Sequence, residues 1–297
     1  MRLKTLLELG RVSNVPTVWS NVLCGAALSG AFSNLPAHAP ALVFAGLAGT
    51  AFYVGGMFLN DAFDAEIDAR ERPERPIPRG EATREQVQAI GGGLLAAGIG
   101  TLVLGALLGL TPAGMAWPLA GAATALAVVF YDRFHKGIAW SPVVMGLCRA
   151  GLYVLGALAV AAVPSALTWQ AAAALLLYIV GLTHIARFET ATAVGRFWPA
   201  AFLFAPLALA LFEARSRDLL DPIVLGIAAA CVFWTLRALD FARRGGRSIG
   251  TAVVSLIAGI SLVDALFAAA AGAREIAAIA FSLTALTLVA QRKVRGT

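Results

Sequence analysis

Ten long apolar runs, separated by short polar or charged breaks, divide the sequence and use up most of its 297 residues. A helix that crosses a bilayer needs about 20 predominantly apolar residues, and its backbone hydrogen bonds must be satisfied within the segment. We therefore interpret each run as a membrane-spanning helix. The predicted spans are Val15–Ala31, Ala41–Leu59, Val87–Leu110, Ala113–Tyr131, Pro142–Val163, Trp169–Ala186, Phe197–Phe212, Pro222–Leu239, Ile249–Ala271 and Ile276–Ala290.

The composition agrees with this division and excludes a water-soluble enzyme. Hydrophobic residues make up 59% of the chain and charged residues 13%, and the mean hydropathy is +0.80. The three cysteines, Cys24, Cys148 and Cys231, lie far apart inside apolar runs, which argues against a structural zinc site or a disulfide framework. The prediction is one integral-membrane domain over residues 1–297. It is all-α, a polytopic bundle of about nine or ten transmembrane helices.

The basic residues mark one side of this predicted bundle. If the N-terminus is cytoplasmic, all but three of the 23 Lys and Arg residues fall on the cytoplasmic side, the exceptions being Arg215, Arg217 and Arg274. Such a bias is typical of cytoplasmic loops. We expect a multi-pass protein of the bacterial inner membrane whose N-terminus and charged loops are cytoplasmic. The net charge of +6 is then explained by orientation, and no nucleic-acid partner is predicted.

Acidic residues gather just after the second apolar run. If that helix continues past Leu59, Asp61, Asp64 and Asp68 share one face, with Asn60 one turn before Asp64. Converging carboxylates repel one another unless a cation lies between them. Mg²⁺ prefers oxygen ligands and bridges to substrate phosphates, so the pattern N-D-x-x-D-x-x-x-D predicts a magnesium site and a phosphorylated ligand.

Cations follow where a diphosphate would need them. Arg72, Arg75 and Arg79 lie in a proline-rich turn after the aspartates, and Lys136 and Arg149 lie beyond the fourth span. A guanidinium group can donate two parallel hydrogen bonds to phosphate oxygens, and the lysine ammonium adds a point charge. The alternative is a solvated connection whose opposite charges pair with each other.

The run NDAFDAEIDARERPERPIPRG closely resembles the first aspartate-rich motif of the UbiA-type intramembrane prenyltransferases. The likeness extends to Arg11, Pro16 and Asn21 at the first span and to YDRFHK, residues 131–136, after the fourth. The resemblance implies a helical bundle of about nine spans that opens to the cytoplasm and laterally to lipid. It also implies binding of a polyprenyl diphosphate through Mg²⁺.

The second half departs from the family pattern. A second motif, D-x-x-x-D, is normal after the sixth span, but this chain has THIARFETAT at residues 183–192. Glu189 is the one acidic residue there, and His184 or Arg187 could supply the charge of a second metal. Ordinary two-metal prenyl transfer is therefore in question.

The predicted function is Mg²⁺-dependent transfer of a polyprenyl group, within the membrane, from an isoprenoid diphosphate to a small aromatic or quinone-like acceptor. The alternative is a degenerate homologue that binds or transports a prenylated lipid without catalysis. Asn60, Asp61, Asp64 and Asp68 are the predicted metal ligands, and Asp64, Lys136 and Arg75 the predicted catalytic residues. The predicted substrate-binding residues are Arg11, Asn21, Arg72, Tyr131, Arg149, Arg187 and Glu189.

Asp264, Tyr131 and Phe134 each keep two interpretations, and His135 has one. Asp264 lies in the middle of a predicted span, where an ionisable side chain is costly and usually functional, or it is protonated and bonded to a neighbouring helix. Tyr131 and Phe134 either face a developing carbocation or anchor the chain at the interface. His135 is interpreted as a loop residue without partners that suggest catalysis.

Overall fold

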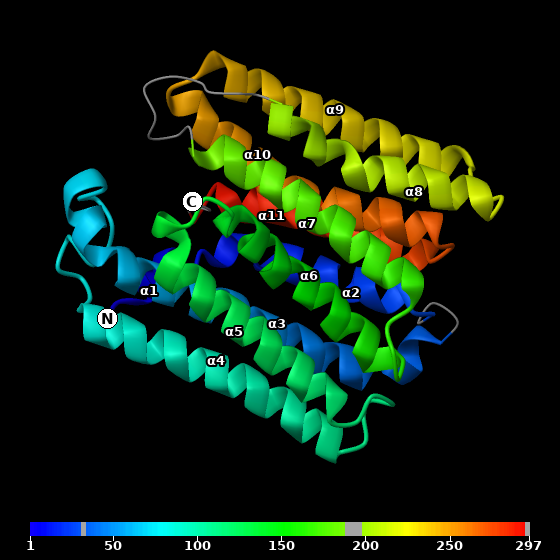
Figure 1. Cartoon of the computed structure of the whole chain (residues 1–297), viewed down its shortest axis with the longest axis horizontal. Helices are drawn as coiled ribbons and strands as arrows, with labels where there is room; N and C mark the ends of the chain where they lie inside the picture. Colours follow the sequence, from blue (N-terminus) through cyan, green and yellow to red (C-terminus); the bar gives the residue numbers. More distant parts are fainter. Residues whose placement is uncertain (31–33, 188–197, 295–297) are drawn as a thin grey trace.

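The computed structural model is an antiparallel bundle of helices and describes residues 1–30, 34–187 and 198–294 (Figure 1). No strand occurs in these ranges. Three short 3-10 segments, η1 (Val12–Asn14), η3 (His135–Gly137) and η5 (Trp198–Phe204), join or extend the helices. The α-helices are α1 (Leu3–Leu9), α2 (Val15–Leu28), α3 (Leu35–Glu71), α4 (Arg84–Leu107), α5 (Ala116–Phe134), α6 (Ser141–Val160), α7 (Ala166–Ala186), α8 (Ala205–Ser216), α9 (Pro222–Arg244), α10 (Arg247–Ala270) and α11 (Arg274–Gln291).

The predicted all-α membrane fold is confirmed. Each of the ten predicted spans coincides with a helix, from α2 to α11, although the predicted start of the seventh at Phe197 lies outside the described residues. Eight of these helices are long and apolar enough to cross a membrane by length and composition, and α2 and α5 are not among them. The chain is therefore an integral, multi-pass membrane protein.

Polar residues set the helix ends outside the apolar runs. Thr83 caps α4 with a reciprocal capping box to Gln86. Asp221 caps α9 by accepting the backbone N–H groups of Val224 and Ile223 and also pairs with Arg274. These hydrogen bonds, led by the one from Val224, together with the nearby Arg274, lower the pKa of Asp221 from its ordinary value.

Helices α2 and α6 approach each other at backbone contact. A Cβ atom added to Gly25 would lie 2.0 Å from the carbonyl oxygen of Tyr153, and one added to Gly156 would lie 1.9 Å from that of Val22. Only glycine fits at such a crossing, which is a common way for helices to associate in lipid. The close crossing brings polar residues of α2 and α6 within bonding distance of one another.

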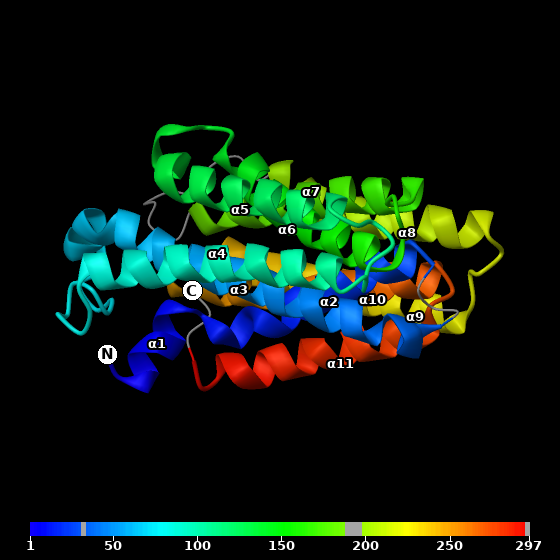
Figure 2. The ribbon, with the colours of Figure 1, turned by 90° about the horizontal axis from the view of Figure 1, so that it is seen from below.

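Helix α10 lies at the centre of the bundle. It packs against α2, α7, α8, α9 and α11, and 89% of its most apolar stretch is buried inside the protein. Figure 2 shows α11 on one side of the molecule, with α5 on the opposite side.

The connections α3–α4, α5–α6 and α9–α10 meet at one end of the bundle, where both chain termini also lie (Figure 1). At the other end, Arg215 lies in the last turn of α8, Arg217 follows that helix, and Arg274 begins α11. The fold thus sorts the basic residues as the predicted topology requires. The predicted site residues of α3 and η3 lie at the end that carries most of the charge.

Candidate active site

Helix α3 continues well past its apolar part, as predicted, and carries the aspartates into the bundle. Asp61, Asp64 and Asp68 have exposed fractions of only 5%, 8% and 5%. A charged side chain that is buried needs partners, so a solvated connection does not describe these three residues. That alternative does describe Glu66, which is exposed and pairs with Arg84 at 3.2 Å.

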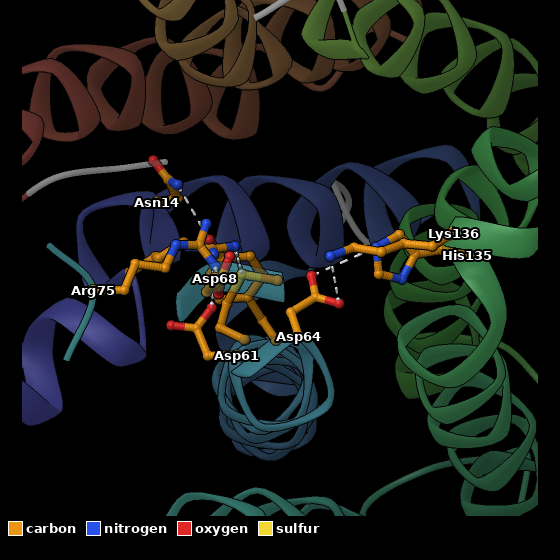
Figure 3. Close-up of polar contacts among 10 residues, drawn as sticks. Asn14, Asp61, Asp64, Asp68, Arg75, His135 and Lys136 are labelled. Atoms are coloured by element: carbon orange, nitrogen blue, oxygen red, sulfur yellow. Dashed lines mark hydrogen bonds and ion pairs between the residues drawn. The ribbon is translucent and has the colours of Figure 1, made fainter. Parts of the chain in front are cut away.

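Arginines hold the first and last of the three aspartates. The Asp61 carboxylate accepts from Arg11 at 3.0 Å and from Arg75 at 2.9 Å. Arg75 also donates to Asp68 at 2.8 Å, and so bridges the two carboxylates (Figure 3). Arg11 has a left-handed backbone, φ 41°, which is uncommon outside glycine and is often found where a side chain must reach a functional site.

Asp64 faces the opposite way, toward the connection between α5 and α6. Its carboxylate lies 3.0 Å from the Lys136 ammonium and 3.7 Å from Nε2 of His135 (Figure 3). His135 does lie in the connection between two helices, as predicted, but the expectation that it has no partner suggesting catalysis is wrong. The fifth helix ends at Phe134, and the following 3-10 turn directs His135 and Lys136 back over α3; this turn could not be inferred from the sequence.

A cavity of about 690 Å³ opens beside Asp64. Charged groups line one part of it, and apolar side chains line another. The apolar wall includes Phe52, Leu152, Ile179, Leu182, Val253, Ile257 and Ile260 from α3, α6, α7 and α10. A pocket with both kinds of lining suits a ligand that has an ionic head and a hydrocarbon chain.

Most of the predicted site residues line this cavity. They are Arg11, Asn60, Asp64, Asp68, Arg72, Arg75, Tyr131, Lys136, Arg149 and Arg187. Asp61 and Asn21 do not, because Asp61 is enclosed by two arginines and Asn21, which is fully buried, lies behind Arg149. Glu189 lies outside the described residues. Arg187 donates to Ser141 at 2.9 Å, and so ties the end of α7 to the start of α6.

Asp132 is a cavity residue to which the sequence analysis assigned no role. It is 3% exposed, it accepts a hydrogen bond from Asn60, and its Oδ2 has no protein partner in the described part of the chain. A carboxylate at the end of the fourth apolar run was the available signal, but nothing in the spacing connects it with Asn60.

Further inside the bundle, Arg149 forms a second polar part of the cavity. Its guanidinium carbon lies 5.2 Å from the centre of the Tyr53 ring, and it donates to Thr17 at 3.0 Å and to Asn21 at 3.1 Å. Asn14 donates to the Tyr53 hydroxyl at 3.2 Å. The cavity therefore has a cationic group at a distance from the aspartates of α3.

The proline-rich turn after α3 is held by hydrogen bonds. Backbone hydrogen bonds from Gly80 to Ile77 and from Glu81 to Pro76 close it. Glu81 accepts from Thr5 at 2.9 Å and from Arg79 at 3.1 Å. The Thr5 hydroxyl and, to a lesser degree, the Arg79 guanidinium lower the pKa of Glu81 from its ordinary value. Arg79 thus braces the turn instead of lining the cavity.

These features can be compared with known proteins. A model of the UbiA prenyltransferase family matches residues 15–241, a stretch that includes the aspartates of α3 and the connection that holds Lys136. The chain belongs to the UbiA prenyltransferase family. The resemblance seen in the aspartate-rich run is thereby confirmed.

Two curated relatives of this UbiA chain carry different names. Digeranylgeranylglyceryl phosphate synthase of Ignicoccus hospitalis is 36% identical over 137 residues, 46% of this chain and 40% of that protein. Chlorophyll synthase of Oryza sativa is 40% identical over 94 residues, 31% of this chain and 24% of that protein. The chain thus matches less than half the length of each.

A solved structure of a digeranylgeranylglyceryl phosphate synthase is similar in fold, with a TM-score of 0.63 and 18% identity. The likeness covers 92% of this chain and 99% of that one. The likeness in helical architecture therefore extends over nearly the whole chain.

The donor atoms of the cavity suit Mg²⁺. Asn60, Asp64, Asp68 and Asp132 offer amide or carboxylate oxygens, and Oδ2 of Asp132 is buried without a protein partner. No cluster of three or more carboxylate, imidazole or thiol groups arranged for a metal is found among the described residues. Mg²⁺ in proteins is commonly held by one or two carboxylates plus substrate phosphates and waters, so an all-protein cage is not needed.

Tyr131 and Phe134, which each had two interpretations, occupy different environments in the structure. Tyr131 lines the cavity and stacks on His135, with ring centres 4.9 Å apart. Phe134 is 49% exposed and packs on Phe130 outside the cavity, with Trp140 beside them. Such an outward group is typical of an interfacial anchor, whereas Tyr131 is placed to meet a bound ligand.

Proposed function

We propose that this UbiA chain is an Mg²⁺-dependent prenyltransferase that moves a polyprenyl group from an isoprenoid diphosphate to a small acceptor inside the membrane. The observation that carries the proposal is the position of Asp64 and Lys136 in a cavity whose other walls are apolar. An ionic diphosphate and a hydrocarbon chain can be accommodated in such a cavity together. The names of the relatives, two synthases of prenylated products, agree with it.

Each group near Asp64 has a proposed part in the release of diphosphate. Asn60, Asp64, Asp68 and Asp132 would hold Mg²⁺, which when bound neutralises the diphosphate as the allylic C–O bond breaks. The Lys136 ammonium, which pairs with Asp64, can donate a hydrogen bond to a phosphate oxygen, and the Arg72 guanidinium can donate to a second one. The diphosphate leaves with the electron pair, the allylic carbon bonds to the acceptor, and the acceptor loses a proton.

The remaining walls protect the allylic cation. Phe52, Leu152 and Ile179 exclude water, so that the cation meets the acceptor before it is hydrolysed. Tyr131 offers an aromatic face to the positive charge. We place the head of the acceptor near Arg149, because this cation is separate from the diphosphate site. A small aromatic or quinone-like acceptor remains the proposed class, and the Ignicoccus relative's name adds a phosphate-bearing lipid as the competing class.

A transfer assay tests the proposal. Protein in lipid nanodiscs, given Mg²⁺ and labelled geranylgeranyl diphosphate, is expected to form a prenylated product with an aromatic acid, a quinol or a glyceryl phosphate lipid. Diphosphate should appear in equal amount, and chelation of Mg²⁺ should stop both. Tight donor binding without diphosphate release for any acceptor would contradict catalysis. It would favour the alternative, a protein that binds or transports prenylated lipid.

We also propose that the end of the bundle that carries Asp64 faces the cytoplasm of a bacterial inner membrane, because most Lys and Arg of the described residues lie toward that end. Single cysteines at the exposed Glu74 and Ser216 probe the two ends. An impermeant maleimide should label Glu74→Cys in inside-out vesicles and Ser216→Cys in right-side-out ones. The reverse labelling would contradict the orientation.

A further inference from the structure

Asp264 lies in the middle of α10, fully enclosed at 0% exposure, and belongs to a polar cluster in the apolar core. Its carboxylate accepts from the Tyr153 hydroxyl at 2.6 Å, from the Ser20 hydroxyl, and from the Asn21 amide at 2.8 and 3.1 Å. Ser261 adds a hydroxyl 2.9 Å from that of Ser20. The cluster joins α2, α6 and α10, and the residues matched by the family model end before Asp264, at residue 241.

The cluster leaves one orientation for the Asn21 amide. Both hydrogen bonds to Asp264 come from Nδ2, and Oδ1 accepts from Arg149 at 3.1 Å. A flipped amide would place its NH₂ group against a guanidinium and its oxygen against a carboxylate. Neither pair can form a hydrogen bond. The Asp264 carboxylate and the Arg149 guanidinium therefore favour the same orientation of the Asn21 amide, in which Oδ1 faces Arg149.

In the series of contacts from Asp264 through Asn21 to Arg149, Arg149 is the residue that lines the cavity. Its Nη1 donates to Thr17 and Asn21, and its guanidinium lies over the Tyr53 ring. Nε and Nη2 make no hydrogen bond to the described residues, and the side chain lines the cavity. Arg149 lies about two helical turns inside α6, deeper than Lys136. One edge of the guanidinium is thus fixed by the protein while the other is available to a ligand.

We propose that Asp264 is a positioning residue: through the Asn21 amide it holds the Arg149 guanidinium as a binding site for an oxyanion, the anionic head of the acceptor. This inference rests on the proposed function and adds the acceptor's chemical class, an amphiphile with a phosphate or carboxylate head. A buried carboxylate and a buried guanidinium bridged by one amide polarise each other, and the low dielectric strengthens the chain of hydrogen bonds.

The competing explanation is that Asp264 only fastens three helices together. A fastener would affect the stability of the protein and every ligand alike. A positioning residue acts on what Arg149 binds, so its effect must disappear when Arg149 is absent. The two explanations therefore differ in a double-mutant cycle.

The experiment measures binding of dodecyl phosphate, by titration calorimetry on detergent-purified protein with chelator present. Arg149→Gln is expected to weaken binding about tenfold, as for loss of a charge-assisted hydrogen-bond donor. Asp264→Asn should weaken it about fivefold, because a neutral amide oxygen holds the Asn21 NH₂ group less firmly than the carboxylate does. The double variant should bind within about twofold of Arg149→Gln alone.

Ser261→Ala is the matched control. It removes a hydroxyl from the same cluster that touches neither Asn21 nor Arg149, and should leave affinity unchanged. Should Asp264→Asn fail to fold, Asn21→Leu breaks the same chain of contacts while the Ser20 and Tyr153 donors to Asp264 remain, and should reproduce the fivefold loss.

Three results would overturn the inference: wild-type protein that does not bind the probe, variants whose effects multiply in the double variant, or an affinity that Asn21→Leu leaves unchanged. The measurement needs no turnover. A protein that binds the probe through Arg149 but transfers no prenyl group to any acceptor would contradict the proposed function; the oxyanion site at Arg149 and its positioning by Asp264 would stand, but not its assignment to an acceptor.

Discussion

Replacement of Asp64 by asparagine is expected to lower prenyl transfer by about 100-fold or more, since an amide cannot supply the charge that a metal–diphosphate complex needs. Asp64 is 8% exposed, lines the cavity, and pairs with Lys136 at 3.0 Å. Its loss would also remove the carboxylate that pairs with Lys136. The measurement is diphosphate release at saturating donor, together with the Mg²⁺ concentration that gives half-maximal rate, which should rise.

Glu66→Gln provides the matched control on the same helix. This substitution also changes a carboxylate to an amide, but the Glu66 side chain is 84% exposed and pairs only with Arg84 among the described residues. Its rate should stay within about twofold of wild type, as expected when an exposed ion pair is lost. If Asp64→Asn changed neither donor binding nor turnover, the assignment of the α3 aspartates to the reaction would fail.

Gly156→Ala is expected to have the largest effect on the stability of the bundle. The added Cβ would lie 1.9 Å from the Val22 carbonyl oxygen and 2.7 Å from its carbon. Both are backbone atoms, so α2 and α6 must move apart. Overpacking of this kind raises the free energy of the folded state by about 3 kcal/mol or more. Thermal unfolding in detergent should show a large fall in Tm and a low folded yield.

Gly226→Ala, the same change on α9, is the control. Nothing lies within 4 Å of the position where its Cβ would be, and alanine favours a helix over glycine by about 1 kcal/mol. Its Tm should be equal to or above that of wild type. Equal unfolding temperatures for Gly156→Ala and wild type would show that the α2–α6 crossing is looser than described.

The helices could be predicted because lipid imposes a simple rule on sequence. Each span needs a continuous apolar run, and every predicted run proved to be a helix. The shared face of Asp61, Asp64 and Asp68 was predicted on the condition that the helix continues past Leu59, and α3 does continue to Glu71. The sorting of Lys and Arg to one end followed from the same alternation of spans.

The composition of the site was harder to predict, because it depends on contacts between distant segments. The spacing placed Asp61 with the metal ligands, whereas the structure encloses it between Arg11 and Arg75, residues 50 and 14 positions away. Asp132 and His135 gain their place only when α5 packs beside α3. The two interpretations of Asp264 needed the positions of Ser20, Asn21 and Tyr153, which no periodicity reveals.

The central position of α10 has a consequence for biosynthesis. Chains are made from the N-terminus. Helices α2 and α6 therefore leave the ribosome long before α10, which carries Asp264. A nascent chain that stops short of Arg247 contains Arg149 and Asn21 but not the carboxylate that orients them. Until α10 is synthesised and inserted, the earlier helices must therefore stay in the membrane without the helix that packs against α2, α7, α8 and α9.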